Sequence, residues 1–132
     1  MICPLRTFVI FLDGHGFTRK ILKKGFVHIQ ILLCDGFNWI LIDPTFTHLE
    51  WYILPIAAKE DPFREYVPDG KIIKMHQCPV KKKIWVGRIG ILSCVLIARY
   101  YLGIHKSILT PYRLYRFILN NNLGEDYGRK IW

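Results

Sequence analysis

The chain has 132 residues, of which 52% are hydrophobic and 14% aromatic. This length and composition are typical of one folded domain (residues 1–132) and exclude a disordered chain. The formal net charge of +9 favours an acidic partner. The basic residues are scattered, however, and their only tight run, Lys81 to Lys83, is expected to be a solvated turn, so nucleic-acid binding is the less favoured function.

The N-terminal part of the chain predicts a strand, a loop and a short helix. Residues 7–12 form an apolar run that favours a strand. The glycines on either side of His15 predict an exposed loop. Residues 17–24 place Ile21 and Leu22 among four basic residues, which predicts a short amphipathic helix that ends at Gly25.

Residues 26–43 form the strongest structural motif, two apolar runs joined at Asp35-Gly36. Asp-Gly between such runs predicts a two-residue hairpin turn, because both central residues of a type I′ turn have positive φ. In that register His28 faces Asp43, with their Cβ atoms roughly 5 Å apart. A carboxylate beside a histidine orients the imidazole and stabilises its charged form. A slip of one residue would turn Asp43 to the other face.

A third strand is predicted after a turn at Pro44. Residues 48–55 alternate in hydrophobicity, which favours a strand. His48 would then lie near Asp43 across a short loop. His48 is therefore the alternative third residue of a site built on His28.

The middle of the chain predicts a connection and two further strands. Residues 57–70 contain several turn-forming residues and are expected to be a connecting excursion. Residues 71–77 and 83–86 are expected to be strands.

Two helices are predicted in the last third. Ser93 is expected to cap a helix that stops at Gly103, so that Cys94 lies in the first turn. There the free amides and the helix dipole favour a thiolate, although core packing is the alternative role for a cysteine. Residues 110–119 begin with Thr-Pro and predict the last helix. The tail from Gly124 onward is expected to be at most partly ordered.

Together these elements predict an α+β fold, an antiparallel sheet of about five strands with helices packed against it. Both faces of the central hairpin are apolar, so both should be covered by other elements. We expect the start of the Cys94 helix to pack over the face that carries His28 and Asp43. The Cys94 sulfur should then lie within about 4 Å of an imidazole nitrogen.

No metal site, secretory signal or membrane span is predicted. The four cysteines show no metal-ligand spacing, and the close pair His76 and Cys78 lacks further ligands. The apolar run at residues 8–12 is too short for a signal peptide. The longest uncharged apolar stretch, residues 89–98, is well below the roughly 18 residues that a membrane helix needs. We therefore expect a cytoplasmic protein with free thiols and no cofactor.

Three motifs occur in a distinctive order. A basic segment leads into the histidine strand (GHGFTRKILKKGFVHIQIL), the hairpin returns to Asp43, and a late cysteine begins a helix (ILSCVLIARYYLGI). This order resembles the circularly permuted NlpC-type branch of the papain-like fold, which includes the lecithin retinol acyltransferase-like enzymes and places the histidine strand before the cysteine helix. The chain is also similar to small phage-encoded proteins with a closing LGI…TPYxLY segment, here residues 102–115.

The resemblance implies a thiol-dependent hydrolase or acyltransferase of the peptidase or amidase type. Cys94 matches the nucleophile, His28 the base and Asp43 the polar third residue. A histidine is often third in this family, so His48 remains the alternative. The reaction would form a thioester with a peptide, amide or acyl substrate. If the chain is phage-encoded, the resemblance implies a location in the host cytoplasm or the virion.

Two other functions stay open at this stage. A non-catalytic phage or viral interaction protein would keep the same fold without turnover. A basic nucleic-acid-binding protein would instead gather Lys and Arg with exposed aromatic rings on one face. Reactivity of the Cys94 thiol distinguishes the enzyme from the first, and binding to DNA distinguishes it from the second.

Overall fold

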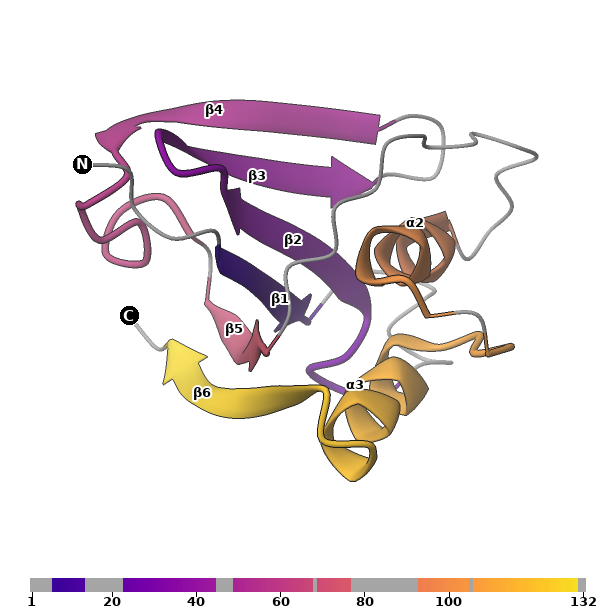
Figure 1. The fold of residues 1–132 in the computed structure, drawn as a ribbon. Coiled ribbons are helices and arrows are strands. Elements are labelled where there is room, and N and C mark those ends of the chain that lie inside the picture. Colours follow the sequence, from indigo (N-terminus) through magenta and orange to yellow (C-terminus); the bar gives the residue numbers. More distant parts are fainter. Residues whose placement is uncertain are drawn as a thin grey trace.

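The computed structural model describes residues 6–13, 23–44, 49–67, 69–76, 93–104 and 106–130, which form one antiparallel sheet and two helices (Figure 1). The strand order is β4-β3-β2-β1-β5-β6, and every neighbouring pair is antiparallel. The predicted α+β class with an antiparallel sheet is therefore confirmed. The elements are β1 (Arg6–Leu12), β2 (His28–Cys34), β3 (Asn38–Pro44), β4 (Leu49–Ala57), β5 (Gly70–Met75), α2 (Ser93–Leu102), α3 (Pro111–Asn120) and β6 (Gly124–Lys130).

The described part of the sheet has six strands where about five were predicted, because the tail forms β6. The sequence of β6, GEDYGRK, lacks the apolar alternation that marks a strand. The strand is held by backbone pairing with β5 and contains a bulge at Tyr127, next to Gly128 with φ of 107°. The predicted strand at 83–86, the run Lys81 to Lys83 and most of the predicted helix at 17–24 lie outside the described residues.

The end of α2 and the start of α3 follow the predicted signals, whereas Ser93, which was predicted to cap α2, is its first helical residue. α2 stops before Gly103, whose φ of 70° lies in the left-handed region that favours glycine. At the start of α3 the Thr110 Oγ1 accepts a hydrogen bond from the Arg113 backbone N at 3.3 Å, and Pro111 is the first helical residue. This cap satisfies one of the amide groups that a helix start leaves without a partner.

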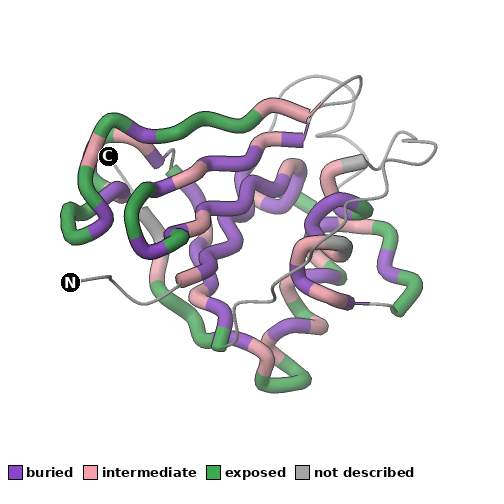
Figure 2. Tube along the Cα trace, turned by 45° about the horizontal axis from the view of Figure 1, so that its top comes forward, coloured by how far each residue is buried: buried purple, intermediate pink, exposed green. Residues whose placement is uncertain are grey.

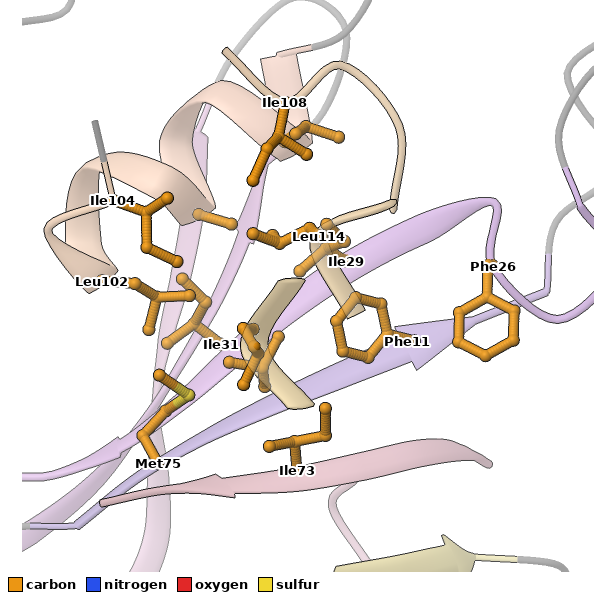
Figure 3. Packing of buried hydrophobic residues seen from close by; sticks show 14 of the residues in the cluster. Phe11, Phe26, Ile29, Ile31, Ile73, Met75, Leu102, Ile104, Ile108 and Leu114 are labelled. Atoms are coloured by element: carbon orange, nitrogen blue, oxygen red, sulfur yellow. The ribbon is translucent and has the colours of Figure 1, made fainter. Parts of the chain in front are cut away.

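The main core lies between the helices and one face of the sheet (Figure 3). α2 rests on β2 and β3, and α3 contacts β6. The buried side chains of this core include Val9, Phe11, Ile29, Ile31, Ile42 and Ile73 from the sheet, Val95, Ala98 and Leu102 from α2, and Leu114 and Ile118 from α3. Alternate residues of each strand supply this face.

A second core covers the opposite face of the sheet. Buried residues of the four inner strands, among them Phe8, Ile10, Leu32, Trp39 and Ile72, pack there against the excursion 58–67. The expectation that both hairpin faces are covered is therefore confirmed. Figure 2 shows the consequence, because the central strands are mostly buried whereas β4 at the sheet edge is largely exposed.

Candidate active site

The hairpin turn lies one residue later than predicted. Its two loop residues are Gly36 and Phe37, because the Asp35 backbone N donates to the Asn38 carbonyl O at 3.2 Å. The Asp35 Oδ1 accepts hydrogen bonds from the backbone N of Phe37 (2.8 Å) and of Asn38 (2.7 Å). Asp35 therefore caps the turn from its flank instead of occupying a central position. Gly36 supplies the positive φ, 100°, that the turn requires.

The strand register differs accordingly from the predicted one by two residues. Cys34 pairs with Trp39 and not with Phe37. Continued by one pair beyond Ile31 and Ile42, this register sets Gln30, not His28, opposite Asp43. The direct pairing of His28 with Asp43 was therefore wrong. A shift of two residues nevertheless keeps every side chain on its predicted face, because the pleat repeats every two residues.

His28 and Asp43 meet as diagonal neighbours across the hairpin. The His28 Nε2 lies 2.5 Å from the Asp43 Oδ1, a charge-assisted hydrogen bond. The two side chains are 29% and 21% exposed, so the pair is accessible from solvent. The predicted meeting of an imidazole and a carboxylate is thus present.

Cys94 is the third member of this group. It is the second residue of α2, where the backbone amides have no partner within the helix. Its side chain is partly buried and hydrogen-bonds with His28. The structure therefore brings Cys94, His28 and Asp43 together in one hydrogen-bonded series.

The two partners determine the charge of His28. Burial, the largest influence, would lower the pKa of His28. The hydrogen bonds to Asp43 and Cys94, with the negative charges of both, outweigh it and raise the pKa from 6.5 to about 9. His28 is therefore protonated at neutral pH.

The face on which α2 packs differs from the prediction. Val95 belongs to the core formed by Ile29 and Ile31, whereas His28 pairs with Leu12, which belongs to the core on the opposite face. The helix therefore does not cover the His28 face. Contact with Cys94 is still made because His28 is the first residue of β2, at the open end of the hairpin.

Gln30 is the site neighbour that sequence reasoning overlooked. It is one of two buried polar residues of the described sheet interior, and its Oε1 has no hydrogen-bond partner. Continued by one pair, the register of β2 and β3 sets it opposite Asp43, and it lies two residues from His28 on the same face of β2. Only the correct register could have identified it, since the predicted register set Gln30 opposite Leu41.

Among the remaining candidates, only His76 lies within the described residues. His15, His48 and Cys78 lie outside the described residues, so the choice of His48 as third residue is not tested. His76 is exposed at the end of β5. Within the described residues no three His, Cys, Asp or Glu side chains are placed to hold a metal ion. Neither described helix is long and apolar enough to cross a membrane.

No protein-family model, no curated protein and no solved structure matches this chain.

Proposed function

We propose that this protein is a thiol-dependent hydrolase or acyltransferase, with Cys94 as nucleophile, His28 as acid and base, and Asp43 as the residue that positions His28. One observation carries the proposal, the hydrogen-bonded series from Cys94 through His28 to Asp43. A nucleophile, a base within hydrogen-bond reach and an orienting carboxylate are the parts that covalent acyl transfer requires. We also propose a permuted papain-like fold, in keeping with the histidine strand, the late cysteine helix and the antiparallel sheet.

The chemistry begins from the thiolate and imidazolium pair. The Cys94 sulfur attacks a carbonyl carbon and forms a tetrahedral intermediate, whose oxyanion accepts a hydrogen bond from a free amide at the start of α2. The intermediate collapses to a thioester, and His28 gives its proton to the departing amine or alcohol. His28 is suited to this step because its raised pKa keeps it protonated at neutral pH.

The second half of the reaction returns the enzyme to its starting state. Neutral His28 takes a proton from the acyl acceptor, which attacks the thioester and releases Cys94 as the thiolate. Water as acceptor makes the protein a peptidase or amidase, and an amine or alcohol makes it an acyltransferase. Asp43 holds the imidazole in one orientation throughout.

Alkylation by iodoacetamide tests the proposal, with the labelled peptide located by mass spectrometry. At pH 6 an ordinary thiol is almost wholly protonated, so we expect Cys94 to react roughly tenfold or more faster in the wild type than in His28→Gln. Cys34 is the matched control, since it is a free thiol that is only 2% exposed. The Cys34→Ala variant should label at Cys94 like the wild type.

Acyl transfer itself is tested with p-nitrophenyl acetate. We expect an acetyl group on Cys94 and release of p-nitrophenol, both lost in Cys94→Ala and reduced in His28→Gln. Equal alkylation rates of Cys94 in the wild type and His28→Gln at pH 6 would remove the ion pair on which the proposal depends. An activated Cys94 that never accepts an acetyl group would favour the non-catalytic interaction protein.

A further inference from the structure

The outer face of α3 carries two arginines between two aromatic rings. α3 lies on the outside of the molecule beside the start of β6, and its buried residues point to the core (Figure 1). At 3.6 residues per turn, the opposite side of the helix is formed, in order around the axis, by Tyr112, Arg116, Asn120, Arg113 and Phe117. Both arginines are exposed, and the two rings are partly buried.

A lysine from another segment lies against each ring. The Nζ of Lys23, which precedes β2, lies 4.0 Å from the centroid of the Tyr112 ring. The Nζ of Lys106, which lies between α2 and α3, is 5.9 Å from the centroid of the Phe117 ring. A cation within about 6 Å of an aromatic face is attracted to it, so the rings hold both exposed lysines beside the arginines. This surface, the α3 basic face, thus contains Lys23, Lys106, Arg113 and Arg116.

Carboxylates near the α3 basic face are fewer than its cations. Asp13 lies at one margin, where its Oδ1 accepts a hydrogen bond from the Gly25 backbone N at 3.2 Å. Glu125 is exposed at the other margin, near the start of β6, and Asp126 after it pairs with Lys71. Within the described residues none of the four cations forms an ion pair with a carboxylate. The face therefore presents a net positive charge to solvent.

The charges of α3 are also placed against the helix dipole. The positive end of the dipole lies at the helix start, so carboxylates stabilise the first turn and cations the last. α3 has no acidic residue in its first turn and no basic residue in its last turn, and Arg113 is its third residue. Helix stability therefore does not account for this arginine. An anion bound beside Arg113 would interact favourably with both the guanidinium and the helix end.

We propose that the α3 basic face binds a single nucleic-acid strand through its phosphates, without reading the base sequence. The guanidinium fork matches the oxygens of a phosphate, and Arg113 and Arg116 lie about one turn apart, within reach of neighbouring phosphates. A flexible single strand can bend to reach the lysines on both sides of the helix. The net charge of +9 attracts such a polyanion.

A membrane surface suits this face less well. An interfacial helix inserts an apolar face into the lipid, whereas the apolar face of α3 is buried in the protein core. Leu109, just before α3, is the single large apolar side chain exposed there among the described residues. The outward side of α3 is centred on Arg113 and Arg116 instead.

Fluorescence anisotropy of a labelled oligothymidylate tests the proposal on the full chain at several salt concentrations. Each phosphate contact contributes about 0.7 to the salt dependence for a single strand, so four cations predict a slope of log affinity against log salt of about −3. The double variant Arg113→Gln/Arg116→Gln should halve this slope and weaken binding roughly tenfold or more. The matched control, Lys59→Gln/Arg64→Gln, removes two exposed cations from the excursion on the opposite face of the sheet and should leave the slope unchanged.

Arg113→Glu separates binding from folding. A carboxylate in the first turn of α3 suits the dipole, so this variant should unfold at a higher urea concentration than the wild type and still bind the oligonucleotide more weakly. None of the four cations takes part in the Cys94 site, so this test and the alkylation test fail independently.

Three results would overturn the proposal. The first is the absence of saturable oligothymidylate binding. The second is an equal loss of affinity in the α3 double variant and in its control, because binding would then depend on net charge alone. The third is binding of polyglutamate as tightly as the oligonucleotide, or of phosphatidylserine vesicles in its place, which would assign the face to an acidic protein or to a membrane.

Discussion

Replacing Asp43 by Asn tests how the site stabilises the charge on His28. The amide keeps the shape of the side chain but removes the negative charge that favours the imidazolium. We therefore expect the pKa of His28 to fall below about 9 in Asp43→Asn. The change is measured directly by NMR titration of the His28 ring signals.

The same change has a defined effect on stability. A histidine whose folded-state pKa is raised stabilises the fold fully below pH 6.5, and this contribution is lost as the pH rises through about 9. The interval from 6.5 to about 9 corresponds to roughly 3 kcal/mol. The interactions of His28 with Asp43 and with Cys94 together account for this free energy. We therefore expect Asp43→Asn to lower the free energy of unfolding by about 1–2 kcal/mol at pH 6. The loss should become smaller by pH 9.5.

Urea unfolding at several pH values between 6 and 9.5 measures this loss. Asp126→Asn is the matched control, because the partner of Asp126 in its ion pair is Lys71 and not a histidine. The free-energy difference between wild type and Asp126→Asn should therefore be nearly constant. A difference for Asp43→Asn that is constant or grows with pH would refute the account of His28.

Substitutions at four further positions test the fold by urea unfolding. Gly70→Ala should lower the free energy of unfolding by more than about 2 kcal/mol, because the new Cβ would lie 2.5 Å from the Phe11 carbonyl O. In Gly103→Ala the new Cβ would meet no atom within 4 Å, so the only cost should be the backbone strain of a φ of 70°. Thr110→Ala removes the side chain that caps α3 and should lower the free energy of unfolding by about 1 kcal/mol. Thr110→Ser keeps the hydroxyl group and should retain most of the stability. Gln30→Leu should leave stability unchanged or raise it, since the buried Oε1 has no partner to lose. A loss as large as that of a core truncation in Gln30→Leu would show that the amide is needed.

The fold could be predicted from the sequence where local signals are strong. The apolar runs of the first three strands, the Thr110-Pro111 start of α3 and the glycine stop of α2 all depend on neighbouring residues alone. β6 could not be predicted in this way, because its residues are mostly polar and its stability comes from pairing with β5. The register error at Asp35 has a similar origin, since Asp-Gly is compatible with either of two positions in the turn.

The site could be predicted as far as it depends on which face of the sheet each side chain points to. His28 and Asp43 share a face under either register, so the error of two residues left them together. The face chosen by α2 could not be predicted, since both faces of the hairpin are apolar and the choice depends on long-range packing.

The position of Cys94 in a helix remote in sequence from the hairpin has a consequence for folding. His28 and Asp43 lie on neighbouring strands of one hairpin and can meet early, since short loops close quickly. Cys94 joins them only when α2 docks on β2 and β3. A newly made chain therefore lacks the partners of this thiol until α2 docks, and the appearance of fast alkylation after dilution from urea times that docking in a single measurement.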